Sequence, residues 1–449
     1  MADLLSIGAS GVKAYQTALA VTGDNIANVG TPDYTRRVVR LNEVAAGVGK
    51  VEGNTAGNGV LMSGIVRSTN DYATLAVRSA GADLARTASS VEWMGRIETA
   101  LTGNNLGARV TSFFSSATAL AAEPDSTALR QGMLSTAESA AIAFTVTGKA
   151  LDQVASDIDV AGQQAASQLT AFGQALQQVN DGLGRTTPGT SAAAQLTDQR
   201  DAILANMSAL VDVGVTTDTL GRATVTLGGS GGAVFVAKGE SGMVRYNRSG
   251  GTVALSVITS GPAQILDPNG GALAGIVDGA QRVATARQGV NNIATDLVDK
   301  VNKQQALGDD RDGVKGTDLF AVSTAPGATP TDISVVPTDG AKIAAAGIGK
   351  GKRDASNLAA LNTLRTGRGW EASLTAVVTD NATAYDQKKT IAAAQTAIRD
   401  GALTSLSSTT GVNLDNEAVQ LMRFQQAYSA CSRVIQVARD TLQSILDIR

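Results

Sequence analysis

The sequence contains no histidine, and this absence removes more functions than any other feature of its composition. Without an imidazole, Ser-His-Asp and Cys-His catalysis are excluded, and the commonest ligand of catalytic zinc or non-haem iron is missing. The single cysteine, Cys431, allows neither an intrachain disulfide nor a cysteine-based metal cluster. We therefore expect no catalytic residue, no metal and no cofactor.

Aromatic residues are also scarce, at 3% of the 449 positions, although 43% of the residues are hydrophobic. A core of Ala, Val, Leu and Ile suits thin helix-on-helix packing better than an interior with a deep pocket. The net charge of -3 provides no basic field for nucleic acid or an anionic membrane. No apolar run is long enough to predict a transmembrane helix, and Asp3 with Gly8 does not fit a secretory signal.

Both ends of the chain carry apolar ladders with a seven-residue step. The first comprises Leu5, Val12, Leu19 and Ile26, and the second comprises Leu414, Leu421, Tyr428, Ile435 and Leu442, with Phe424, Cys431, Ala438 and Ile445 alongside. A heptad predicts a seam between helices, although an ordinary core can produce the same spacing. Three glycines in the first helix, at Gly8, Gly11 and Gly23, each cost about 1 kcal/mol relative to Ala. We therefore expect the two terminal helices to pair and to need neighbouring chains for full stability.

Between the ends, the patterns predict a helical body that contains a β-rich insertion. The longest helix runs from about Ser126 to Asn180 and spans about 80 Å. Further helices are expected from Tyr72 to Gly103, through Phe113 and Leu120, over Ser191–Leu210, from Gly270 to Leu307, through Leu358–Leu361 and, after Arg368-Gly369, from Leu374 to Leu406. Leu41 to Met62 is typical of an extended connector, and β-branched runs broken by glycine predict strands from Val211 to Asp267.

The fold class is therefore mainly α with a β-rich insertion: a long helical bundle with paired N- and C-terminal coiled-coil helices. We divide it into a terminal helical domain (1–60 plus 405–449), a helix-bundle domain (61–210 plus 270–404) and an inserted β-rich outer domain (211–269).

Two sequence segments at opposite ends identify a family resemblance. The first ladder continues into TGDNIANVGTPDYTRR, from Thr22 to Arg37, and the second contains RFQQAYSA, from Arg423 to Ala430. These segments resemble the terminal signatures of bacterial flagellar axial proteins, and the RFQQAY run favours the hook-associated protein 1 family at the junction between hook and filament. The resemblance is close over roughly the first and last forty residues and looser from Gly270 to about Asp309. Asp33 departs from the family pattern, which usually has glycine after the proline.

The resemblance implies a structural subunit that is exported through the flagellar type III apparatus without a cleaved signal peptide and becomes extracellular. Its terminal helices would form the inner tube of the axial structure. Implied partners are copies of itself in a ring, the hook protein, the second junction protein beneath the filament and a cytoplasmic export chaperone, with no nucleic acid and no membrane insertion. The expected assembly interface consists of Leu5, Val12, Leu19, Asn25, Ile26, Asn28, Tyr34, Leu414, Leu421, Phe424, Tyr428, Ile435, Leu442 and Ile445.

Other interpretations stay open at this point. The chain could be another axial protein, namely hook, distal rod or the second junction protein. An axial protein with a hydrolytic insertion is disfavoured, because Val211 to Asp267 offers only scattered acids. The loop from Gly308 to Gly313 resembles a calcium loop but has Gly308 and Leu319 where that motif needs acids, so we interpret it as a solvated turn.

Overall fold

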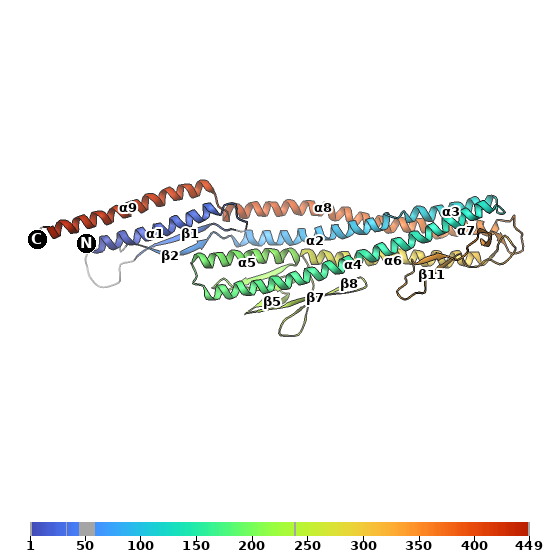
Figure 1. Cartoon of the computed structure of the whole chain (residues 1–449), viewed down its shortest axis with the longest axis horizontal. Helices are drawn as coiled ribbons and strands as arrows, with labels where there is room; N and C mark the ends of the chain where they lie inside the picture. Colours follow the sequence, from blue (N-terminus) through green and yellow to red (C-terminus); the bar gives the residue numbers. More distant parts are fainter. Residues whose placement is uncertain (1, 33, 45–58, 238, 448–449) are drawn as a thin grey trace.

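A computed structural model describes residues 2–32, 34–44, 59–237 and 239–447, with side chains from residue 4 onward. The molecule is a long rod, and both chain ends lie at the same extremity (Figure 1). Asp33, with its unusual turn position, and most of the connector expected between Leu41 and Met62 lie outside the described residues.

Long helices dominate the described part of the chain, and this confirms the mainly α class. The helices are α1 Ala2–Ala27, α2 Asp71–Thr102, α3 Leu106–Ala122, α4 Thr127–Arg185, α5 Ser191–Leu210, α6 Gly271–Gln305, α7 Ser356–Arg368, α8 Trp370–Thr410 and α9 Leu414–Asp447. The strands are β1 Arg37–Glu43, β2 Val60–Arg67, β3 Val213–Thr217, β4 Ala223–Leu227, β5 Ala233–Ala237, β6 Glu240–Ser241, β7 Met243–Ser249, β8 Thr252–Ile258, β9 Gln264–Leu266, β10 Gly308–Asp309, β11 Phe320–Val322, β12 Ile333–Val335 and β13 Ala346–Gly347, and a 3-10 turn covers Gly340–Lys342.

The terminal helices α1 and α9 lie side by side and antiparallel, beyond the end of the helical body (Figure 1). The expected meeting of the two termini is therefore confirmed. An antiparallel hairpin of β1 and β2 lies against α1 and leads the chain into α2. The start of α2, the end of α8 and the start of α9 meet beside this hairpin: Arg36 N–H donates to Thr410 O at 3.0 Å, and Ser68 N–H donates to Arg36 O at 2.8 Å. We call this region the elbow.

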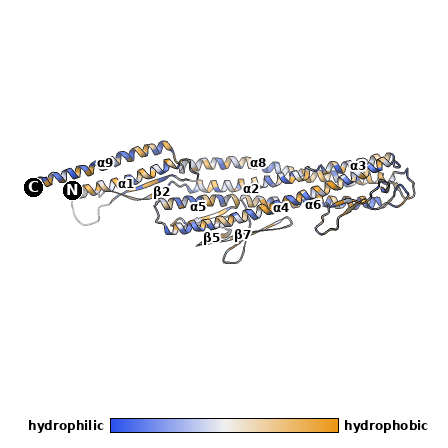
Figure 2. Cartoon of the chain, in the orientation of Figure 1, coloured by the Kyte–Doolittle hydropathy of each residue, from blue (hydrophilic) through white to orange (hydrophobic). Residues whose placement is uncertain are grey.

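The body is organised around α4, which is 59 residues long and therefore spans about 90 Å. Ser126 caps its start by accepting a hydrogen bond from Leu129 N–H at 3.4 Å. Its heptad residues line the core, with Leu151 and Ile158 fully buried. Helix α2 packs along α8 and α6, while α3, α5 and α6 pack on α4, so thin layers of small side chains fill the interior. Figure 2 shows hydrophobic and hydrophilic residues interspersed along these helices.

The strands from β3 to β9 form two antiparallel sheets, β3-β4-β5-β6 and β7-β8-β9, that lie along the flank of α4 (Figure 1). Gly162 lets β7 approach closely, since a Cβ there would overlap the Tyr246 ring. Tyr246 Oη donates to Asp159 Oδ1 at 3.0 Å, and Arg248 pairs with the same carboxylate at 2.7 Å. Apolar residues of these sheets belong to the same core as α4. The three-domain division remains a prediction.

The loop after β10 lies at the end of the rod opposite the termini. Asp310 is buried and accepts hydrogen bonds from Asp312 N–H and Val314 N–H, both at 2.9 Å, and Lys342 Nζ lies 3.1 Å from its carboxylate. The interpretation of this loop as a solvated turn was therefore wrong for Asp310, because its own backbone and a lysine satisfy the carboxylate. Within the described residues, no group of three or more His, Cys, Asp or Glu side chains could hold a metal ion.

Candidate assembly interface

The contact between α1 and α9 is made close by glycine. A Cβ built on Gly8 would lie 2.7 Å from Ile435 Cγ1, and one on Gly11 would lie 2.5 Å from Cys431 Sγ. Next to these glycines, α1 buries three further apolar residues on the same side: Ala14, Ala18 and Val21. The side of α1 that meets α9 is therefore a glycine-alanine face, which lets the two backbones approach closely.

This face differs from the seam expected on the first helix. Leu5, Val12, Leu19 and Ile26 are only half-buried. Ala14 and Ala18, by contrast, are buried within the chain. Glycine enters the expectation only as a cost in helix propensity, while its lack of a side chain also decides which face of α1 can come closest to α9. The role of the four ladder residues in assembly stays a prediction.

The expected seam on α9 fits the structure better. Leu421, Phe424, Tyr428 and Ile435 are half-buried, and the Phe424 ring lies 6.3 Å from that of Tyr15 on α1. Cys431 lies on the same side, and burial raises the pKa of its thiol, as expected for a small packing residue. Three predicted interface residues near the ends of α9 are exposed in the single chain, as residues that contact a neighbouring copy would be: Leu414, Leu442 and Ile445.

Asn25 is the polar centre of the elbow and is 1% exposed. Its carboxamide bonds both backbone groups of Arg37, accepting from the N–H at 3.0 Å and donating to the C=O at 2.8 Å. It thus satisfies the edge of β1 as a neighbouring strand would. Tyr34 Oη donates to Asn25 Oδ1 at 2.9 Å, and burial raises the pKa of the Tyr34 phenol, which favours this donor role.

Glu417 connects this centre to α9. Its carboxylate is 1% exposed and accepts from Asn25 Nδ2 at 2.9 Å, while Arg36 Nε lies 2.6 Å from its other oxygen. The hydrogen bond joins residues 392 positions apart and ties α1, β1 and α9 together. Asn28 behaves differently: it donates to Asp24 O at 2.8 Å within its own turn, as expected for a helix end.

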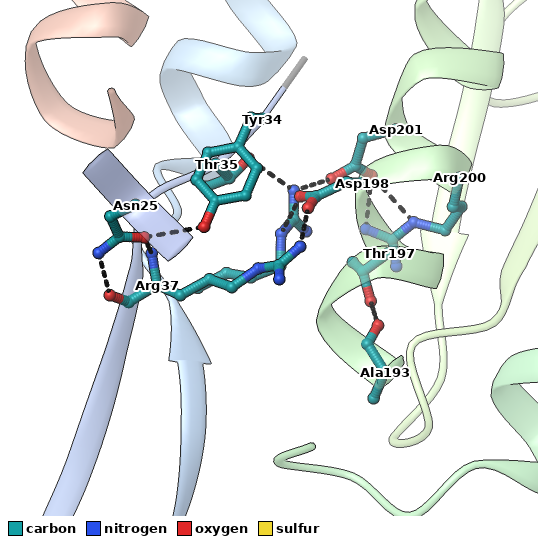
Figure 3. A network of polar contacts seen from close by, with 10 residues as sticks. Asn25, Tyr34, Thr35, Arg37, Ala193, Thr197, Asp198, Arg200 and Asp201 are labelled. Atoms are coloured by element: carbon teal, nitrogen blue, oxygen red, sulfur yellow. Dashed lines mark hydrogen bonds and ion pairs between the residues drawn. The ribbon is translucent and has the colours of Figure 1, made fainter. Parts of the chain in front are cut away.

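Arginines of the hairpin connect the elbow to α5. Arg37 and Arg67 both pair with Asp198, at 3.1 and 2.7 Å, and Arg67 also pairs with Asp201 at 2.8 Å. Arg200 takes the other oxygen of Asp201 at 2.6 Å. Figure 3 shows Arg37 reaching from the strand to Asp198 while its backbone stays on Asn25. These pairs fix the terminal helices to the body through charge-assisted bonds.

Several residues of this network were not among the predicted site residues. Glu417 lies six residues before the RFQQAYSA segment, and Arg36 and Arg37 end the TGDNIANVGTPDYTRR segment. The available signal was the charge of these three residues within or close to the two segments that resemble the family. Asp198 carried no signal, because only the folded chain brings α5 to the hairpin.

The outer surface of the terminal pair exposes large apolar residues among polar ones, in the part of the chain that the structure describes. On α9 the exposed large apolar residues are Leu414, Val419, Met422, Val434, Val437, Leu442, Ile445 and Leu446, and Leu4 adds to them on α1. Exposed apolar surface of this extent marks an interaction site. No helix in the described part of the chain is long and apolar enough to cross a membrane.

Family models of flagellar proteins match three segments of this chain. The family model described as "Flagellar hook-associated protein FlgK helical domain" matches residues 94–320. A model for flagella basal body rod proteins matches residues 5–35, and one for the C-terminal part of rod FlgEFG proteins matches residues 404–448.

Individual relatives are named flagellar hook-associated protein 1. Flagellar hook-associated protein 1 of Salmonella typhimurium is 27% identical over 72% of this chain and 60% of its own length, and that of Escherichia coli is 26% identical over 75% and 65%. The chain thus spans less than two thirds of these two relatives. The Bacillus subtilis protein of that name is 21% identical over 97% of this chain and 96% of its own length.

A solved structure shares the fold. The flagellar hook junction protein FlgK from Burkholderia pseudomallei superposes with a TM-score of 0.66 at 15% identity, over 74% of this chain and 99% of that one. The helical-domain model covers just over half of the 449 residues, in the part of the chain that forms the body described above. The chain therefore belongs to the flagellar hook-associated protein FlgK family.

Proposed function

We propose that this protein is a structural subunit of the bacterial flagellum that forms the junction between hook and filament. Family membership supports this role, and the observation that carries it is the terminal helix pair, which is tied to the body at the elbow and exposes large apolar residues on its outer surface. Such a pair is suited to lie against the same pair of a neighbouring copy.

Assembly is coupled to folding of the terminal helices in this proposal. The α1 face toward α9 consists largely of glycine and alanine, so the pairing of these two helices buries few side-chain carbons. Helices in proteins take most of their stability from tertiary packing, and an isolated helix is only marginally stable in water. The terminal segments are therefore largely unfolded in the free subunit, pass through the export apparatus, and fold when neighbouring copies cover their apolar sides.

Deletion of the gene tests the role at the junction. Cells without the protein are expected to build complete hooks, to carry no filaments, and to release flagellin into the medium. Electron microscopy of the cells and immunoblotting of the medium provide these two measurements. Plasmid-borne wild-type chain should restore filaments.

The second candidate is another axial protein of the rod or hook. The rod-protein models that match residues 5–35 and 404–448 favour it, because these two segments make up most of the terminal helices. Deletion discriminates between the candidates, since loss of a rod or hook subunit removes the hook itself.

The proposed partners are copies of the chain in a ring, hook protein on one side, the second junction protein beneath the filament on the other, and an export chaperone in the cytoplasm. The proposed location is extracellular, after export without a cleaved signal peptide. We propose a structural role without enzymatic activity, since the family is one of structural flagellar proteins and the segment from Val211 to Asp267 offers only scattered acids. Incubation of the purified chain with peptidoglycan and with casein tests this, and release of soluble fragments would contradict it.

A further inference from the structure

Arg78 on α2 makes no direct hydrogen bond or ion pair with its side chain in the part of the chain that the structure describes. Its Nε is buried without a hydrogen bond, and within the described residues its guanidinium makes no ion pair. The two carboxylates of α5 at the elbow, Asp198 and Asp201, already pair with three other arginines: Arg37, Arg67 and Arg200. A partly buried guanidinium without a direct hydrogen-bond or ion-pair partner is costly. A carboxylate of another molecule would remove this cost.

Two exposed apolar residues precede Arg78 at helical spacing. Tyr72 is 89% exposed and Leu75 is 57% exposed, in a chain where aromatic residues are only 3% of the total. Residues three apart are neighbours on a helix surface, so Tyr72, Leu75 and Arg78 form a continuous strip, which we call the α2 strip. Tyrosine and arginine are the residue types that dominate binding energy at protein interfaces.

A matching strip lies at the start of α9. Asp415 is exposed and makes no ion pair within the described residues, and it is followed by Val419 and Met422, which are 58% and 55% exposed. Positions i, i+4 and i+7 share one helix face, and we call these three residues the α9 strip. Glu417, between them in sequence, points the other way, into the elbow.

The geometry points to the α2 strip of one copy as the docking site for the α9 strip of a neighbouring copy, with Asp415 pairing with Arg78 and Val419 and Met422 covering Leu75 and Tyr72. Each strip has one charge and two apolar residues, with opposite signs. Both lie at the elbow, so every copy presents both halves of the contact. Because the two halves are different surfaces, the contact repeats from copy to copy and generates a ring or a helical array. This inference rests on the proposed assembly role and names the surfaces that meet.

Cross-linking between differently tagged chains tests the contact directly. In a Cys431→Ala background, one chain carries Leu75→Cys and the other Val419→Cys, and both are expressed in cells that lack the native gene. Isolated hook–filament particles are oxidised, and disulfide-linked dimers are scored by non-reducing gel and immunoblotting for both tags. We expect mixed dimers from this pair. The matched control replaces Leu75→Cys by Ile265→Cys, which lies on β9 and is 88% exposed, and should give at least tenfold less mixed dimer.

Charge reversal provides an independent measurement. Arg78→Glu alone or Asp415→Arg alone should lower the fraction of hooks that carry filaments about tenfold, and the double variant should recover most of it. Thermal unfolding of each purified chain identifies variants that fail to fold, and Arg78→Lys should retain filaments. Mixed dimers no more abundant than with Ile265→Cys, or a double variant no better than the singles, would overturn the inference. Absence of the wild-type chain from hook–filament particles would instead overturn the proposed function.

Discussion

Replacing either of two glycines of α1 by alanine should have opposite effects on the terminal helix pair. A Cβ at Gly23 meets nothing within 4 Å, so Gly23→Ala gains helix propensity of about 1 kcal/mol at no steric cost. A Cβ at Gly11 lies 2.5 Å from Cys431 Sγ and 3.3 Å from Cys431 Cβ, so Gly11→Ala gains the same propensity but must displace the Cys431 side chain within the contact with α9. Overpacking of this kind costs about 1–3 kcal/mol. The two variants should therefore differ by about 1–3 kcal/mol in the stability of the pair, which is roughly a 5- to 150-fold difference in its opening equilibrium.

Protease cleavage in isolated hook–filament particles measures this difference. When reclosing is fast relative to cleavage, the rate at which α1 is cut follows the population of the open form. We expect Gly11→Ala particles to be cut in α1 faster than wild type, and Gly23→Ala particles more slowly. Gly11→Ala combined with Cys431→Ala should recover most of the loss, because the clashing sulfur is gone. Equal cutting rates for the two single variants would refute the close contact between α1 and α9.

Three further predictions concern other contacts. Glu417→Ala should destabilise the assembled terminal pair by about 2–4 kcal/mol, because it leaves Asn25 and Arg36 without their buried acceptor, and electron microscopy should then show fewer hooks with filaments than in Glu417→Gln cells. Because Arg248 holds the pKa of the Asp159 carboxyl below its ordinary value of 3.8, this pair stabilises the packing of β7 on α4 at neutral pH and loses that effect as the pH falls through the lowered pKa. The protection of the β7 amides from hydrogen exchange, taken relative to the intrinsic rate at each pH, should fall in this acidic range in wild type, and in Asp159→Asn it should be low already at pH 7. Arg130→Ala should lower the unfolding free energy by about 3–5 kcal/mol in denaturant titrations, since the side chain is 1% exposed and donates only to backbone carbonyls that would lose their partner; no change would contradict a structural role.

The long-range organisation could be predicted from the sequence because it depends on periodicity. The heptads of α4, such as Leu151 and Ile158, are buried as expected, and the two terminal helices that carry the apolar ladders do lie side by side. Both signals arise within one helix and require no knowledge of what packs on it.

The details of the elbow depend on residues that only the fold brings together. Asp198 is an ordinary acid in the sequence of α5, and it becomes the partner of Arg37 only when the hairpin lies against that helix. The glycine-alanine face of α1 was missed for a related reason: Gly11 matters through the closeness of Cys431, which lies 420 positions away in the sequence. Contacts of this kind are tertiary and leave no periodic signal.

Limited proteolysis of the free chain and of the assembled particle, with cut sites mapped by mass spectrometry, is the most direct test of coupled folding and assembly. In the free chain we expect the first cuts within α1 and α9 while the body from α2 to α8 stays intact, and in the particle we expect both terminal helices to resist. Terminal helices that resist cleavage in the free chain as well as α4 does would contradict the account.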